Sequence, residues 1–522
     1  MKSPEVRMKS IVTVAMAGAA LLTVAATAAP AAAQKPARPN VIVILADDLG
    51  YGDTGVYGSK IVKTPNIDAL AADGVRFTQG YVSHPVCAPS RSAIMTGRYQ
   101  TRFGYEFNPV GRDRTRGVAL TETFIPKVMK SAGYSTGMVG KWHLGESGDY
   151  HPTGRGFDQY FGILGGAGAF ITDARPGDEF HTPQNARGSY GTAEGGPAIT
   201  AMTEAEEMVV IRQRAPVYRG RDAVEVKSYL TDAFTDEALR FIGENKDRPF
   251  FLYLAHTAPH TPLQATAKYI ERYKHIENKG QRVYAAMVSA LDDSVGAVRA
   301  KLKAEGIEKN TLVVFLSDNG CAGYVGDACT NSPLNGYKAG HLEGGVRVPF
   351  IMAMPGRIKA GQVETRVVSS LDIAPTAAAL AGAKMPNGTD GVDLLPYLTG
   401  ANRAAPHPTL YWRSGPNFAI RDGDWKMWVV NRADPSERPR SGTGPVADGV
   451  EAKVSSLGKY VMLFDLKTDL GEKTNLATAR PEVVARLQAK LEAWDKLNVA
   501  PQWTSMRQGV FQHEGQMLKA YP

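Results

Sequence analysis

Polar residues with catalytic potential follow several short apolar runs, at the point where each run ends. These runs and the residues after them are Val41–Ala46 before Asp47 and Asp48, Ser135–Gly140 before Lys141, Trp142 and His143, Phe250–Ala255 before His256 and His260, and Thr311–Leu316 before Asp318 and Asn319. Carboxylates and amides are ligands for hard cations, lysines bind anions, and histidines transfer protons. Brought together, such groups could hold a metal ion beside an anionic substrate and move a proton.

The elements that must position these residues can be predicted from the same runs. Short apolar runs of this kind are typical of strands that are buried on both faces of a parallel sheet. Helical stretches such as Thr121–Ala132 and Gln281–Leu302 separate them. This alternation predicts an α/β fold with a large, mostly parallel sheet flanked by helices. Because ligands bind beyond the carboxyl ends of such strands, we expect the polar residues to share one edge of the sheet.

Cys87 lies in the run His84-Pro85-Val86-Cys87-Ala88-Pro89-Ser90-Arg91-Ser92. A lone cysteine in an apolar stretch is often a buried small hydrophobic residue, and one short motif carries a risk of a false match. The C-x-P-S-R spacing nevertheless resembles the motif that the sulfatase family converts from cysteine to formylglycine.

Other segments resemble sulfatase signatures, in the family's order, over nearly the whole mature chain. They are Asn40–Gly52, Thr64–Asp68, Gly140–Gly145, Arg155–Asp158, Ala258–Pro262, Ser317–Gly320, Gly336–Lys338 and Glu343–Pro349. One such match is weak, whereas the ordered set is specific. The chain thus resembles the formylglycine-dependent (type I) sulfatases and is arylsulfatase-like. The resemblance implies an alkaline-phosphatase-like sheet domain and a smaller C-terminal α+β domain.

The resemblance also implies how a sulfate ester would be cleaved. Formylglycine-generating enzyme would convert Cys87 to formylglycine, whose hydrate would attack sulfur with one hydroxyl and expel sulfate with the other. The implied metal ligands are Asp47, Asp48, Cys87, Asp318 and Asn319. Oxygen ligands suit Ca²⁺ or Mg²⁺ rather than zinc, and the resemblance selects Ca²⁺.

The remaining site residues receive roles from their types and from the family motifs. Arg91 would lie beside the diol, and Lys141 and Lys338 would bind the sulfate oxygens. His143 would hold or deprotonate the diol, and His260 would protonate the leaving oxygen. His256 and Trp142 are interpreted as structural residues, because the family motif places the active histidine at His260 and tryptophan is more often a packing residue.

Other functions share parts of this pattern. A metal-dependent phosphatase or phosphodiesterase would favour a threonine in the place of Cys87. It would also favour a histidine in the place of Asn319, as a ligand of its paired zinc ions. A formylglycine-dependent phosphonate or phosphate ester hydrolase stays open as the alternative, because the motifs alone do not separate it. A non-catalytic binding protein would be favoured if Cys87 or the carboxylates were missing, and they are present.

The N-terminus resembles a secretory signal, with basic residues, the apolar stretch Ile11–Ala29 and an A-x-A site before Gln34. Translation could begin at Met1 or Met8. We expect a signal peptide over residues 1–33, a catalytic sulfatase domain over 34–404 and a C-terminal antiparallel sheet plus helix over 405–522. The protein would be exported to the periplasm or the extracellular space, without a stable membrane anchor.

The composition excludes some partners and leaves other points open. The 522-residue chain has a formal net charge of +8, but its basic residues are scattered, which argues against a nucleic-acid partner. Cys321 and Cys329 could pair in an oxidising compartment or stay reduced. Residues 165–225 are predicted to be an irregular insertion whose arginines either contact anionic groups or are solvated. We expect a sulfated carbohydrate as substrate, with aryl and choline-like sulfates open.

Overall fold

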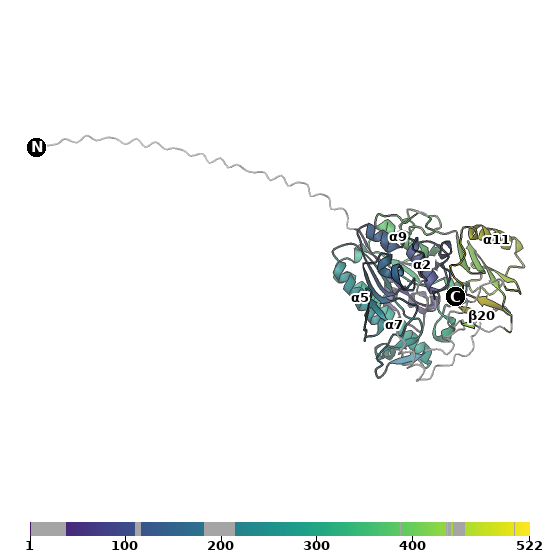
Figure 1. The fold of residues 1–522 in the computed structure, drawn as a ribbon, viewed down its shortest axis with the longest axis horizontal. Coiled ribbons are helices and arrows are strands. Elements are labelled where there is room, and N and C mark those ends of the chain that lie inside the picture. Colours follow the sequence, from purple (N-terminus) through teal and green to yellow (C-terminus); the bar gives the residue numbers. More distant parts are fainter. Residues whose placement is uncertain are drawn as a thin grey trace. The chain divides into compact units, whose positions relative to one another are not determined.

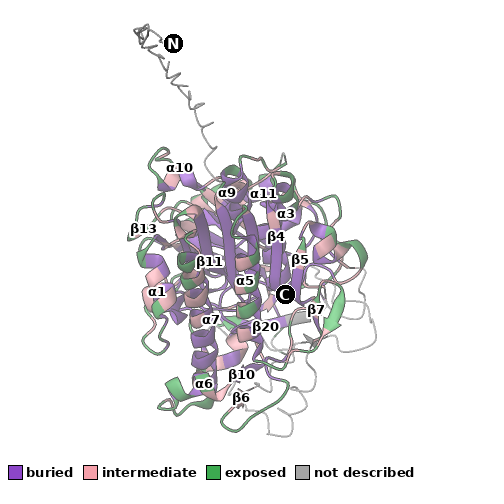
Figure 2. Cartoon of the chain, turned by 90° about the vertical axis from the view of Figure 1, so that its left-hand side faces the viewer, coloured by how far each residue is buried: buried purple, intermediate pink, exposed green. Residues whose placement is uncertain are grey.

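The computed structural model describes residues 1, 38–109, 116–181, 215–386, 388–434, 436, 440–441, 455–505 and 507–521. Its main feature is a ten-stranded sheet of order β13-β2-β12-β11-β1-β9-β4-β5-β7-β8. The five central strands are parallel and buried (Figure 2): β11 (Thr311–Ser317), β1 (Asn40–Ala46), β9 (Phe250–Ala255), β4 (Ser135–Lys141) and β5 (Gln159–Ile163). The predicted large, mostly parallel sheet is therefore confirmed.

The four predicted runs form central strands because their side chains are buried on both faces. Ile42 and Ile44 of β1 belong to one hydrophobic core, and Val41 and Val43 belong to the other. The register of β1 and β11 places their carboxyl ends side by side, since Ala46 of β1 pairs with Ser317 of β11.

Helices cover both faces of the sheet (Figure 1). The core on one face includes residues of α1 (Pro65–Ala72), α5 (Leu230–Asn245) and α7 (Lys279–Ala304), and the core on the other includes residues of α2 (Cys87–Thr96), α3 (Ile125–Ser131) and α9 (Ile373–Leu380). Helix α7 extends beyond the predicted Gln281–Leu302 because Asn278 caps it. Helix α3 starts later than the predicted Thr121, with Pro126 in its first turn.

The edges of the sheet and the smaller elements complete the fold. Further strands are β2 (Val75–Phe77), β3 (Gly80–Tyr81), β12 (Phe350–Ala353), β13 (Gln362–Glu364) and β14 (Val368–Ser369), and short helices are α6 (Ala267–Ile270), α8 (Glu343–Val346) and α10 (Leu395–Leu398). Within the described part of the chain, no helix is both long and apolar enough to span a bilayer. The predicted signal peptide lies outside the described residues, apart from Met1.

The C-terminal part has the predicted antiparallel sheet and covering helix. Strands β15 (Thr409–Ser414), β16 (Asn417–Asp422), β17 (Trp425–Asn431) and β19 (Lys459–Asp465) pair in that order, and α11 (Pro481–Asp495) packs on β16. Strands β18 (Arg440–Ser441), β20 (Arg507–His513) and β21 (Gln516–Ala520) form a further sheet that was not predicted. The domain boundaries at residues 34, 404 and 405 stay predictions.

The prediction of an irregular insertion over residues 165–225 was partly wrong: residues 165–178 contain no helix or strand, but three short segments farther along form strands. Strand β6 (Glu179–His181) pairs with β10 (Leu263–Ala265), while β7 (Val217–Arg219) and β8 (Asp222–Val224) extend the main sheet. Strands of three residues are too short to give a periodic sequence signal. One predicted anion-binding arginine, Arg219, pairs instead with Glu237 at 2.7 Å, and Arg187, Arg212 and Arg214 lie outside the described residues.

Candidate active site

The carboxyl ends of β1 and β11 bring the predicted acidic residues together. Asp47 and Asp48 follow β1, and the backbone N–H of Asp318, which follows β11, donates to the Ala46 carbonyl at 3.1 Å. The N–H of Asp48 donates to Oδ1 of Asp318 at 3.2 Å. Asp48 has a φ of 65°, a left-handed conformation that is uncommon outside glycine. Strained backbone of this kind is concentrated at functional sites.

Cys87 opens helix α2 directly beside these carboxylates. Its Sγ lies 3.6 Å from Oδ1 of Asp47 and 3.9 Å from Oδ1 of Asp48, and the residue is 1% exposed. Burial raises the pKa of the Cys87 thiol to about 12, because the ionised sulfur would lose its hydration. At neutral pH the side chain is therefore a thiol rather than the thiolate that acts as a nucleophile.

Three buried cations balance the three carboxylates. Arg91 donates from Nε to Oδ2 of Asp318 at 2.8 Å. Lys141 Nζ lies 2.7 Å from Oδ2 of Asp47, and Lys338 Nζ lies 2.7 Å from Oδ1 of Asp48. Burying charged groups costs free energy, and pairing them offsets only part of that cost. Large clusters of buried charges are therefore typical of active sites, where the charges take part in catalysis.

Asn319 offers the clearest sign that the site fits a hard cation. Its Nδ2 donates to Oδ1 of Asp48 at 2.7 Å and to the Gly320 carbonyl at 2.9 Å. Its Oδ1 is buried and has no hydrogen-bond partner among the described residues. Buried amide oxygens are rarely left unpaired. This amide oxygen and the carboxylate oxygens of Asp47, Asp48 and Asp318 are donors of the type that Ca²⁺ prefers.

The candidate histidines have different surroundings. A Cβ at Gly166 would lie 2.6 Å from Nε2 of His143, so only glycine lets the chain approach that ring so closely. Burial, with Lys141 and Arg91 nearby, lowers the pKa of His143 well below its ordinary value and keeps the ring neutral. His260 places Nε2 3.6 Å from Oδ2 of Asp48 and Nδ1 2.6 Å from the Thr261 carbonyl.

His256 and Trp142 lie away from the acidic cluster. Nε2 of His256 is 2.9 Å from the hydroxyl of Ser294 on α7, so this side chain faces a helix. The indole N–H of Trp142 donates to the Tyr150 carbonyl at 3.0 Å, and its ring packs between two phenylalanines, Phe124 and Phe157. Both contacts agree with a structural interpretation.

One contact of the cluster was missed from the sequence. The hydroxyl of Tyr324, in the 3₁₀ segment Gly323–Ala328, donates to Oδ2 of Asp48 at 3.1 Å. It lies in an irregular loop, where no periodicity or family motif singles it out.

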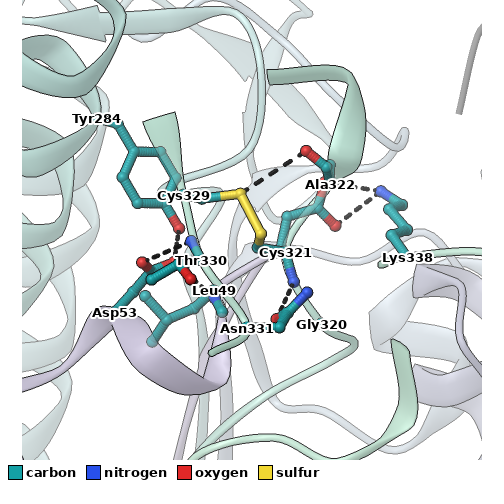
Figure 3. The surroundings of a disulfide bond; sticks show 12 residues. Leu49, Asp53, Tyr284, Gly320, Cys321, Ala322, Cys329, Thr330, Asn331 and Lys338 are labelled. Carbon is teal, nitrogen blue, oxygen red and sulfur yellow. Dashed lines mark hydrogen bonds and ion pairs between the residues drawn. A yellow bond between two sulfur atoms is a disulfide. The ribbon is translucent and has the colours of Figure 1, made fainter. Parts of the chain in front are cut away.

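Cys321 and Cys329 form a disulfide in the loop that follows Asn319 (Figure 3). The sequence alone leaves this pairing open. The carbonyl of Cys321 accepts a hydrogen bond from the backbone N–H of Lys338 at 3.0 Å. The bridged loop thus contacts the backbone that carries one of the two site lysines.

Comparison with known proteins agrees with this geometry. A family model described as Sulfatase matches residues 39–383. N-acetylgalactosamine-6-sulfatase of Mus musculus is 33% identical over 464 residues, which cover 85% of this chain and 83% of that protein. Arylsulfatase A of Homo sapiens is 33% identical over 491 residues, which cover 89% of this chain and 88% of that protein.

A solved structure shows the same similarity in three dimensions. The crystal structure of Ps i-CgsB in complex with k-i-k-neocarrahexaose has a TM-score of 0.73 and 34% sequence identity, and the match covers 89% of this chain and 94% of that chain. The family match spans most of the chain and contains all the candidate site residues. The chain therefore belongs to the sulfatase family and is a sulfuric ester hydrolase.

Proposed function

We propose that the protein cleaves sulfate monoesters with a formylglycine hydrate at Cys87 and a Ca²⁺ ion. The observation that carries the proposal is the state of Cys87, a buried thiol with a raised pKa between two carboxylates. An unmodified thiol of this kind is a poor nucleophile, so its position at the centre of the cluster favours conversion to another group. Formylglycine-generating enzyme would be the partner that performs the conversion.

The cation would be held by Asp47, Asp48, Asp318, Asn319 and the converted Cys87. When bound, Ca²⁺ would offset the charge that develops on the sulfate oxygens. Arg91 donates to Asp318 and, from Nη1, to the Lys141 carbonyl at 3.0 Å, so its guanidinium is held in place within the cluster. Lys141 and Lys338 would bind the anionic oxygens of the ester.

Two histidines would move the protons. The neutral ring of His143 would take a proton from the attacking hydroxyl. His260 is the candidate acid, since its partly exposed ring lies at the edge of the cluster beside Asp48. Burial lowers the pKa of His260 to about 3, whereas Asp48 acts in the opposite direction. An anionic ester next to the ring would raise this lowered pKa, which favours the protonated form that an acid needs.

The substrate class comes from the relatives. The structure of Ps i-CgsB was solved with a neocarrahexaose, and other relatives are N-acetylgalactosamine-6-sulfatases. A sulfated carbohydrate is therefore the proposed substrate, and export through the N-terminal signal would bring the enzyme to such extracellular polyanions. A phosphonate or phosphate ester hydrolase that uses the same nucleophile is the alternative.

A panel of purified substrates tests this function. Wild-type protein from a host with the modifying enzyme should hydrolyse sulfated sugars faster than phosphonate monoesters or phosphate diesters. Higher kcat/KM on the phosphorus esters would favour the alternative instead. Activity on aryl sulfates alone would agree with the proposed sulfatase reaction but would contradict a carbohydrate substrate.

The acid role of His260 predicts a dependence on the leaving group. His260→Ala should lower kcat by roughly 10²-fold or more for a sugar sulfate, whose alkoxide is basic, and far less for nitrophenyl sulfate, which needs little protonation. His256→Gln is the matched control, because His256 lies in the same segment after β9 as His260 but faces Ser294. It should leave the ratio of the two rates unchanged. Equal losses on both substrates in His260→Ala would mean that His260 only positions the sulfate.

A further inference from the structure

The segment that carries Lys338 has a strained backbone. Ala339 has a φ of 72°, a left-handed conformation that is unfavourable for a non-glycine residue. Such a conformation persists only where surrounding contacts hold it. The N–H of Ala339 donates to the Pro85 carbonyl at 2.8 Å, and Pro85 belongs to the run that leads into Cys87. The two segments that deliver Lys338 and Cys87 are thus joined directly.

A buried hydrogen-bonded chain of three side chains, His84–Ser414–His341, joins the same two segments a second time. Nε2 of His84, on the Cys87 side, lies 2.8 Å from the hydroxyl of Ser414, which ends β15. Nε2 of His341, on the Lys338 side, lies 3.3 Å from the same hydroxyl. All three residues are at most 1% exposed. The His341 ring also packs on Trp428 of β17, with 5.8 Å between the ring centres.

The contacts with Ser414 restrict which nitrogen atoms of the two imidazole rings carry a proton. Burial lowers the pKa of His84 to about 3 and that of His341 well below its ordinary value, so both rings are neutral at pH 7. A hydroxyl has one proton, so Ser414 donates to one imidazole and accepts from the other. The two Nε2 atoms must therefore differ in protonation. Both imidazoles therefore use Nε2 in the link through Ser414, and the role that we assign to them is structural.

The C-terminal part of the chain also contacts the Lys338 segment at Glu343. Lys426 of β17 lies 2.8 Å from Oε1 of Glu343, and Oε2 of Glu472 accepts a hydrogen bond from the Glu343 N–H at 2.6 Å. Residues 338–343 are therefore anchored to this sheet at His341 and again at Glu343.

We propose that His84, Ser414 and His341 are positioning residues through which the C-terminal sheet sets the place of Lys338 relative to Cys87. This inference rests on the proposed function, because it assigns Lys338 to the sulfate oxygens. The three residues do not touch the reacting atoms. They act by holding the strained turn at Ala339, and small displacements of a binding group can cost up to about 10²-fold in rate.

Variants at His341 separate polar bridging from packing. His341→Phe keeps a ring against Trp428 but removes the nitrogen that meets Ser414, whereas His341→Gln can place a polar atom near the former Nε2. We expect His341→Phe to lower kcat at least tenfold and His341→Gln to recover most of that loss. Because Lys338 acts on the sulfate, the loss should be equal for sugar and nitrophenyl sulfates. Hydrogen–deuterium exchange in peptides covering residues 338–342 should rise in His341→Phe.

Ser414→Ala provides an independent variant if His341→Phe does not fold. It should also lower kcat and raise hydrogen–deuterium exchange in residues 338–342. Thr409→Val is the matched control, since this hydroxyl on the same strand β15 donates to Asp422 at 2.7 Å, outside the His84–Ser414–His341 chain. Its kcat should match that of the wild type. Wild-type kcat and exchange in both His341→Phe and Ser414→Ala would overturn the inference. Absence of sulfate ester hydrolysis in the wild type would instead refute the proposed function, and the exchange measurement would still test the bridge.

Discussion

Replacement of Cys87 by alanine is expected to lower the turnover of sulfate esters by roughly 10⁴-fold or more, as for other essential nucleophiles. The reason is that the proposed nucleophile forms from this side chain alone, and no other cysteine of the chain is free, since Cys321 and Cys329 are paired. Initial rates on the best substrate of the panel measure the effect. The protein should stay folded, because the substitution at the start of α2 removes one proposed ligand of the cation and leaves Asp47, Asp48, Asp318 and Asn319 in place.

Cys87→Ser is the informative companion variant. Serine can be sulfated but cannot expel sulfate by re-forming an aldehyde, so the variant should stall after at most one transfer. Intact-protein mass would then show a bound sulfuryl group on a fraction of the chains. Sustained turnover in either variant would contradict a mechanism that depends on the aldehyde hydrate.

Loss of a metal ligand should have the second largest effect. Asp318→Asn removes one charge from three buried carboxylates that lie beside an unpaired amide oxygen, and it should lower kcat by roughly 10²-fold or more. Elemental analysis of the wild type should find about one Ca²⁺ per chain. EDTA should lower the melting temperature, since an ion that binds only the native state stabilises it.

Asp158→Asn is a suitable control for the metal prediction. Asp158 accepts a hydrogen bond from the Thr136 N–H at 3.0 Å and precedes β5, so it lies at the amino end of the parallel strands, opposite the acidic cluster. This variant should keep wild-type metal content and rate. Stoichiometric zinc in the wild type, or rate and melting temperature that do not respond to EDTA, would contradict the assignment of a hard cation.

The central sheet and most of the acidic cluster could be predicted from the sequence for a physical reason. Strands buried on both faces give uninterrupted apolar runs, and parallel strands end at one edge, so residues that follow them must meet. Asp48 and Asp318, distant in sequence, are accordingly joined by a hydrogen bond of 3.2 Å. The family motifs then supplied Cys87, whose own surroundings carry no periodic signal.

Features that depend on long-range contacts between irregular segments could not be predicted. Ser414 meets His84 across a separation of 330 residues, and nothing in either local sequence specifies that contact. Tyr324 reaches Asp48 from an irregular loop in the same way. The pairing of Cys321 with Cys329 depends on the distance between their Cα atoms, which a sequence does not show. Strands β7 and β8 were missed because three residues are too few to establish alternation.

The chemical state of Cys87 tests the proposed mechanism most directly. Protein produced in a host with formylglycine-generating enzyme would be digested, and the mass of the peptide that contains Cys87 would be measured. The proposed mechanism predicts that the thiol is replaced by an aldehyde or its hydrate, in a fraction that rises in proportion to specific activity across preparations. Fully active protein in which Cys87 is entirely unmodified would contradict it.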